Sequence, residues 1–229
     1  MIAETAGIAV SLALLCAALV VLALRGVAQY LHGGPRTQLM WGSGLALGAV
    51  AMGIETVIYL GVLDSILLQA YVLVSAAIVG VLSLGSTKVF RNARFENAYI
   101  GFVVASCALL GVFSFLTPLS SSMVSGGVIS ADPPLLLLIL SSVVTGPATV
   151  VLIGAAVLSL RRTWKWQTLT LVAGAFVLGA GGTLYIASFP VVLYYAEFIG
   201  IGLLFTGIVS LPHPSPTSSP LARPALTGP

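Results

Sequence analysis

Charged side chains are scarce in this chain, and their scarcity excludes most classes of soluble protein. Of the 229 residues, 7% are charged and 59% are hydrophobic, and the mean hydropathy is +1.13. A soluble domain of this length needs more polar surface than such a composition provides. The basic residues form no cluster interleaved with aromatic side chains, so no nucleic-acid partner is expected. We predict an all-α, multi-pass protein of the cell membrane that is embedded in the lipid bilayer.

Histidine and cysteine are also scarce, which argues against a haem, metal or disulfide site. His32 and His213 lie outside the apolar segments, whereas a haem held inside a helical bundle needs ligands within the membrane. Cys16 and Cys107 fall inside apolar segments and are expected to be small buried hydrophobic residues. No HExxH, GxSxG or Walker motif is present. We predict no cofactor, no metal site and no enzymatic activity, although an enzyme acting on a membrane lipid stays open.

Seven apolar segments are long enough to cross the roughly 30 Å hydrocarbon layer of a bilayer as helices. Lipid cannot satisfy backbone polar groups, so each segment is expected to be an α-helix. The segments are 5–24, 39–63, 65–86, 97–118, 135–160, 168–189 and 190–211. Residues 1–211 are thus predicted to form one seven-helix transmembrane domain, and the Pro- and Ser-rich residues 212–229 a disordered cytoplasmic tail. Gly44 and Gly48 form the small-residue pattern typical of close helix packing.

The basic residues predict the orientation of the helices. All nine fall on one side of the predicted membrane, whereas Glu4, Asp64 and Asp132 fall on the other. Lys and Arg concentrate in cytoplasmic loops, so the N-terminus is expected outside and the C-terminus in the cytoplasm. The basic residues are Arg25, Arg36, Lys88, Arg91, Arg94, Arg161, Arg162, Lys165 and Arg223.

Two pairs of segments resemble each other, which indicates an internal repeat. When the residues from Leu45 onward are aligned without gaps to those from Leu171 onward, Tyr59 matches Tyr185. Several Gly and Ala positions match as well, but such matches arise easily in an apolar chain. The second and third segments would then correspond to the sixth and seventh, and both pairs would run in the same direction.

Two glutamates interrupt the apolar segments and are the main candidates for a functional site. Glu55 lies roughly 13 Å inward from Asp64, and Glu197 roughly 10 Å inward from Pro190, so similar depths in the outer half are expected. A carboxylate at that depth must be protonated, hydrogen-bonded or open to a water-filled cavity. Tyrosines lie near both glutamates at helical spacing. The predicted proton- or ligand-binding residues are Glu55, Glu197, Tyr59, Tyr71, Tyr194 and Tyr185.

This pattern has two interpretations. In the first, the glutamates line an outward-opening pocket that binds or translocates a proton, a cation or a small polar solute. In the second, each glutamate bonds a hydroxyl group on a neighbouring helix and only stabilises the bundle. The chain would then be a non-catalytic accessory or structural subunit, in contact with other membrane subunits or with further copies of itself.

The stretch from Trp41 through Glu55 and Tyr71 to Gly85, together with GGTLY at 181–185, resembles a group of uncharacterised seven-helix membrane proteins of archaea and bacteria. The resemblance implies the seven-helix arrangement and supplies no activity or functional residue. The same arrangement is similar to that of the rhodopsins, which attach retinal to a lysine in the last helix. No Lys or Arg lies in the seven predicted segments. A covalent retinal protein is therefore excluded, and a lysine-less opsin-like sensor is the second alternative.

Overall fold

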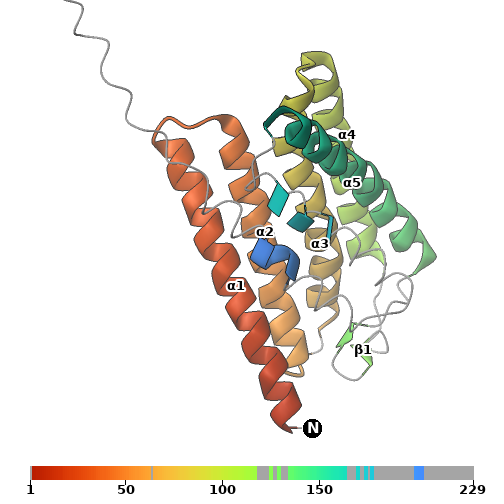
Figure 1. Cartoon of the computed structure of the whole chain (residues 1–229). Helices are drawn as coiled ribbons and strands as arrows, with labels where there is room; N and C mark the ends of the chain where they lie inside the picture. Colours follow the sequence, from red (N-terminus) through yellow and green to blue (C-terminus); the bar gives the residue numbers. More distant parts are fainter. Residues whose placement is uncertain are drawn as a thin grey trace, which may run out of the picture.

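Five long helices dominate the computed structural model (Figure 1). The structure describes residues 2–62, 64–117 and 134–163, with the short stretches 124–125, 128–129, 169–170, 173–174, 176–177 and 199–203. The helices are α1 (Ile2–Leu31), α2 (Arg36–Tyr59), α3 (Ser65–Ser86), α4 (Ala93–Leu116) and α5 (Leu135–Thr163). Each is long and apolar enough to cross a membrane, judged by length and composition. The helical character and five of the predicted segments are therefore confirmed.

The connections between α1, α2, α3 and α4 are short, whereas α4 and α5 are separated by residues 117–134. A 3₁₀ turn, η1 (Thr87–Phe90), follows α3 and leads into α4. Between α4 and α5, the strands β1 (Val124–Ser125) and β2 (Val128–Ile129) form a minimal antiparallel ladder. The predicted segments 168–189 and 190–211 lie largely outside the described residues, but the parts of them that are described are helical.

The helices alternate in direction, and α3 occupies the centre of the five (Figure 1). α1 packs mainly on α2, whereas α3 packs against α2, α4 and α5. The C-terminal ends of α1, α3 and α5 thus lie at the same end of the bundle as the N-terminal ends of α2 and α4 (Figure 1). The described Lys and Arg residues gather at that end. The N-terminus of α1 and the β1–β2 ladder lie toward the other end (Figure 1).

The end of α2 differs from the prediction because of one glycine. Gly61 has φ +97°, a left-handed conformation that glycine adopts without steric cost. Its amide donates to the carbonyl of Ile58 (2.9 Å), and the amide of Val62 donates to that of Val57 (3.2 Å). This pair of bonds is the Schellman motif, which ends a helix. The helix therefore stops at Tyr59, and the predicted end at residue 63 is wrong.

α1 also differs from its prediction, in the opposite direction. The predicted segment ended at residue 24, but the helix continues to Leu31 and contains Arg25. The apolar span found in α1, Val10–Leu31, includes this arginine. The expectation that no basic residue lies within the membrane spans is therefore wrong: Arg36, Lys88, Arg94 and Arg161 lie at or near the ends of the other spans, and Arg25 lies furthest inside its span. It lies about 9 Å along the axis from the end of the helix, a distance that a long arginine side chain can reach.

α1 and α2 approach each other closely at a pair of glycines. A methyl group added to Gly42 would lie 3.1 Å from the carbonyl oxygen of Ala23 and 3.2 Å from the amide nitrogen of Val27. A methyl group added to Gly26 would lie 3.0 Å from the Cα of Gly42. The two backbones therefore touch where both residues lack a side chain.

Candidate functional site

Glu55 is buried in the last turn of α2. The residue is 4% exposed, and its neighbours one turn away on the same helix face, Ala51 and Ile58, are each 1% exposed. α2 ends at Tyr59, so Glu55 lies about 6 Å along the axis from the end of its helix. The expected separation of roughly 13 Å from Asp64 assumed that the helix continues to residue 63, but it ends at Tyr59. Glu55 is thus enclosed by protein but closer to the helix end than the sequence indicated.

Two hydrophobic clusters meet at the position of Glu55. Ala51 and Ile58 belong to a cluster that spans α2 to α5, which we call the Tyr71 cluster; its members are Ala51, Ile58, Leu68, Tyr71, Ala76, Leu110, Leu137 and Val144. Met52, three residues before Glu55, belongs to a second cluster centred on α1 and α2. We call it the Leu19 cluster; its members are Leu12, Leu15, Leu19, Leu22, Ala23, Leu45, Ala49, Met52, Leu82 and Ile201. On α2, Glu55 therefore lies on the seam between the two clusters.

The surroundings of Glu55 disfavour an isolated negative charge. Burial removes the hydration that stabilises a carboxylate. The C-terminal end of a helix carries a partial negative charge, which opposes a second negative charge in the last turn. Arg36 at the start of α2 is 19 residues before Glu55, so the basic end of the bundle is about 28 Å away along the helix. The site therefore suits a protonated carboxyl group or a carboxylate that holds a cation.

Tyr71 is the second predicted site residue that the structure describes in full. It is 9% exposed and belongs to the Tyr71 cluster with Ala51 and Ile58, the two neighbours of Glu55 on α2. The structure thus brings Glu55 and Tyr71 to the same α2–α3 interface. Tyr59 is the last residue of α2, but its side chain lies outside the described part of the chain. Tyr185, Tyr194 and Glu197 also lie outside the described residues.

A short helical stretch, 199–203, from the predicted seventh segment packs against the Leu19 cluster. Its residue Ile201 is 5% exposed and belongs to the Leu19 cluster together with Met52. Figure 1 shows this stretch, in blue, in front of α2 and between α1 and α3. Part of the predicted seventh segment therefore packs against residues of α1, α2 and α3.

Gln69 has a structural role that its sequence position did not reveal. It is 7% exposed, and its Nε2 donates to the carbonyl of Thr117 at the end of α4 (3.1 Å). In return, the fully buried Ser114 donates its hydroxyl to the carbonyl of Gln69 (2.9 Å). These two bonds join α3 to α4 at the end of the bundle where Glu55 lies. Gln69 is therefore part of a helix–helix contact.

A shallow apolar groove runs along α1 and α2 on another face of the bundle. Its volume is about 320 Å³. The lining residues are Cys16, Val20, Ala23, Leu24, Ala46, Ala49 and Val50. At 3.6 residues per turn, the α2 residues of this groove point away from Glu55. The groove and the candidate carboxylate are therefore separate features of α2.

The described residues contain no candidate metal site, and comparisons with known proteins do not extend the description of the Glu55 site. Among the residues that the structure describes, no group of three His, Cys, Asp or Glu side chains is placed to hold a metal ion. Cys16 and Cys107 are free thiols that pack against the hydrophobic clusters, but both are only partly buried, whereas burial was expected. Comparison of the chain with protein-family models, with curated proteins and with solved structures gave no match.

Proposed function

We propose that the chain is a seven-helix protein of the cell membrane that binds or translocates a proton, a cation or a small polar solute at Glu55. The supporting observation is the burial of this carboxyl group, 4% exposed, in the last turn of an apolar helix. Ionisable groups in such positions are costly to keep and are found where membrane proteins move protons or ions. A positively charged or neutral ligand fits the site, because a buried carboxylate repels an anion.

Glu197 is the proposed second member of the site. The sequence predicts one helix over 190–211, and the described stretch 199–203 packs its Ile201 into the Leu19 cluster, to which Met52 also belongs. On that prediction, Glu197 lies one turn before Ile201. On α2, Glu55 lies nearly one turn after Met52. The predicted helix runs antiparallel to α2, so both steps lead toward the same end of the bundle. The two carboxyl groups would then meet at one level.

The proposed topology places this site toward the outside. We propose an extracellular N-terminus and a cytoplasmic C-terminus, because the described basic residues gather at the end of the bundle opposite Glu55. The parallel repeat of helices two and three with six and seven is part of the same proposal. In the ungapped alignment of the two copies, Tyr71 matches Glu197, so the repeat would place these two residues at equivalent positions.

The pair formed by Gln69 and Ser114 supports a second candidate function. In that pair, buried polar side chains join two helices by hydrogen bonds. If Glu55 has the same role, the chain is a non-catalytic accessory subunit of a larger membrane complex. A lysine-less opsin-like sensor has no comparable observation in its favour among the described residues.

Reconstitution separates these two candidates. The purified chain in proteoliposomes is expected to dissipate an imposed gradient of protons or of one monovalent cation, measured with an internal pH or ion indicator. Glu197→Gln is expected to slow that flux about tenfold, because one of two charged ligands is lost. A chain that conducts none of these ions and co-purifies with other membrane proteins after mild solubilisation would contradict the transport proposal.

A cross-linking experiment tests whether the two glutamates face each other. In a chain with Cys16 and Cys107 replaced by Ala, Glu55→Cys paired with Glu197→Cys is expected to form a disulfide with copper phenanthroline as oxidant. The control pairs Glu55→Cys with Ile199→Cys, because Ile199 is 52% exposed and turned away from the bundle. Mobility on a non-reducing gel reports the bond. Efficient cross-linking of the control pair alone would show that the glutamates lie in different surroundings.

A further inference from the structure

The η1–α4 corner joins the ends of two apolar spans. The span in α3 and η1 runs over Ser65–Phe90, and the span in α4 begins at Ala93. Residues 88–96 therefore lie where the chain leaves one membrane helix and enters the next. In a bilayer, this is the depth of the lipid headgroups and not of the hydrocarbon layer.

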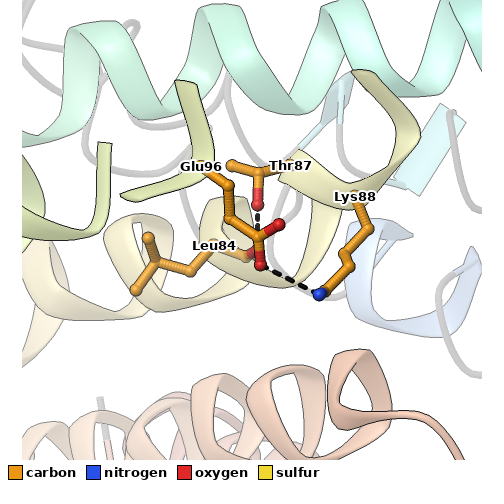
Figure 2. Close-up of polar contacts among 4 residues, drawn as sticks. All are labelled: Leu84, Thr87, Lys88 and Glu96. Carbon is orange, nitrogen blue, oxygen red and sulfur yellow. Dashed lines mark hydrogen bonds and ion pairs between the residues drawn. The ribbon is translucent and has the colours of Figure 1, made fainter. Parts of the chain in front are cut away.

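The charges at this corner are unequal in number. Lys88 Nζ lies 3.1 Å from Glu96 Oε1, and Figure 2 shows the two side chains reaching each other across the turn. This ion pair uses the single carboxylate of the corner. Arg91 and Arg94 are exposed, and no acidic side chain of the described residues pairs with either. Two guanidinium groups thus remain uncompensated within a few residues of each other.

Polar bonds hold the backbone of this corner in one arrangement. The hydroxyl groups of Ser83 and Tyr99 share a hydrogen bond of 2.8 Å between α3 and α4. The Asn92 side chain caps α4 by accepting bonds from the amides of Arg94 (3.1 Å) and Phe95 (3.2 Å). Arg91 has φ +54°, a left-handed conformation that turns the chain between η1 and α4. Both arginines therefore extend from a well-braced turn, which lowers the entropy lost on binding.

An aromatic ladder continues from this turn along α4. The rings of Phe90 and Phe95 pack edge to face at 5.5 Å, and Phe95, Tyr99 and Phe102 follow at 5.7 and 6.1 Å. Phe95 and Phe102 are each 37% exposed. Below the arginines, the corner thus presents aromatic surface that continues into the apolar exterior of α4. A soluble anion would contact the arginines alone, whereas a lipid would contact both parts.

We propose that the η1–α4 corner binds the phosphate headgroup of an anionic membrane lipid through Arg91 and Arg94, with the lipid chains against Phe95 and Phe102. Guanidinium groups match phosphate oxygens in geometry and charge. Basic residues at the membrane surface each attract anionic lipid by about 1 kcal/mol. The proposal requires that α3 and α4 span a bilayer, and it is independent of any role of Glu55.

Lipid retention by the whole chain tests this proposal. The purified protein is exposed to phosphatidylglycerol or to zwitterionic phosphatidylcholine in detergent, and native mass spectrometry counts the bound lipids. The wild type is expected to prefer phosphatidylglycerol. Arg91→Asn combined with Arg94→Gln is expected to weaken phosphatidylglycerol binding about tenfold or more, at roughly fivefold per cation. Asn is chosen because it tolerates the left-handed conformation.

Two further variants distinguish a specific lipid site at this corner from non-specific attraction by the basic residues at this end of the bundle. Arg36→Gln removes an exposed cation from the same end of the bundle but from another corner, and it is expected to change binding less than about twofold. Glu96→Gln releases Lys88 as a third cation and is expected to strengthen phosphatidylglycerol binding about fivefold. Equal losses in Arg36→Gln and the double variant would overturn the proposal. Complete displacement of the lipid by equimolar inorganic phosphate would also overturn it, because it would reveal a site for free anions.

Discussion

Glu55→Gln is expected to reduce proton or cation flux in proteoliposomes by about ten- to a hundredfold. Gln has the shape of Glu and keeps its hydrogen-bonding oxygen, but it cannot carry a negative charge or release a proton. A hydrogen bond to a charged group is worth about 1.5–3 kcal/mol, which corresponds to this range of rates or affinities. Because Glu55 is 4% exposed between two nearly inaccessible neighbours, bulk solvent screens the loss of its charge only weakly.

Asp64→Asn is the matched control for Glu55→Gln. Asp64 is an exposed acidic residue at the same end of the bundle, and its side chain caps α3 by accepting from the amide of Ile66 (2.9 Å). Asn preserves such a cap, so this variant removes one nearby negative charge and leaves the fold unchanged. Its flux is expected to stay within about twofold of the wild type. Unchanged flux in Glu55→Gln, or equal loss in both variants, would rule out Glu55 as the binding group.

Gly42→Leu is expected to give the largest loss of stability in the α1–α2 pair. Even a methyl group at this position would lie 3.1–3.2 Å from backbone atoms of Ala23 and Val27, and backbone cannot move aside as a side chain can. The two helices would have to separate. Overpacking of this kind costs about 1–3 kcal/mol in a core and more where backbones collide. Equilibrium unfolding in a titration from mild detergent to SDS measures the free energy of unfolding.

Gly101→Leu is the control for that experiment. Gly101 lies in α4 on an exposed face, and a methyl group added there would meet no atom within 4 Å. Leu has a higher helix propensity than Gly by roughly 0.8–1 kcal/mol, so this variant is expected to be as stable as the wild type or more stable. A Gly42→Leu protein as stable as the Gly101→Leu protein would show that α1 and α2 separate at little cost.

The helices follow from the sequence because their cause is local. Runs of about 20 apolar residues must form helices wherever water is absent, since the backbone has no other partner. The free cysteines and the burial of Glu55 follow from the same reasoning. α2 ends earlier than expected because Gly61 adopts a left-handed conformation. The last carbonyl groups of α2 then accept hydrogen bonds from the amides of Gly61 and Val62.

Partners across helices were beyond the reach of the sequence. The small-residue pattern at Gly44 and Gly48 suggested one interface, but Gly44 faces Leu82 of α3 and Gly48 faces Leu19 of α1. The backbone contact between α1 and α2 lies instead at Gly42, which faces Gly26, a residue in the segment that the sequence analysis assigned to a loop. Similarly, the bond of Gln69 to Thr117 depends on how far α4 extends.

The sequence by itself determined that the chain is helical, how apolar it is, where its charges lie along the chain and that Glu55 stands in an apolar stretch. These properties depend on single residues and their close neighbours. Only the tertiary structure decided that Glu55 lies on the seam of two clusters, that Lys88 is paired with Glu96, and that Arg91 and Arg94 are left exposed. Each of these depends on the rotation and crossing of whole helices, which residue spacing along one chain segment does not fix.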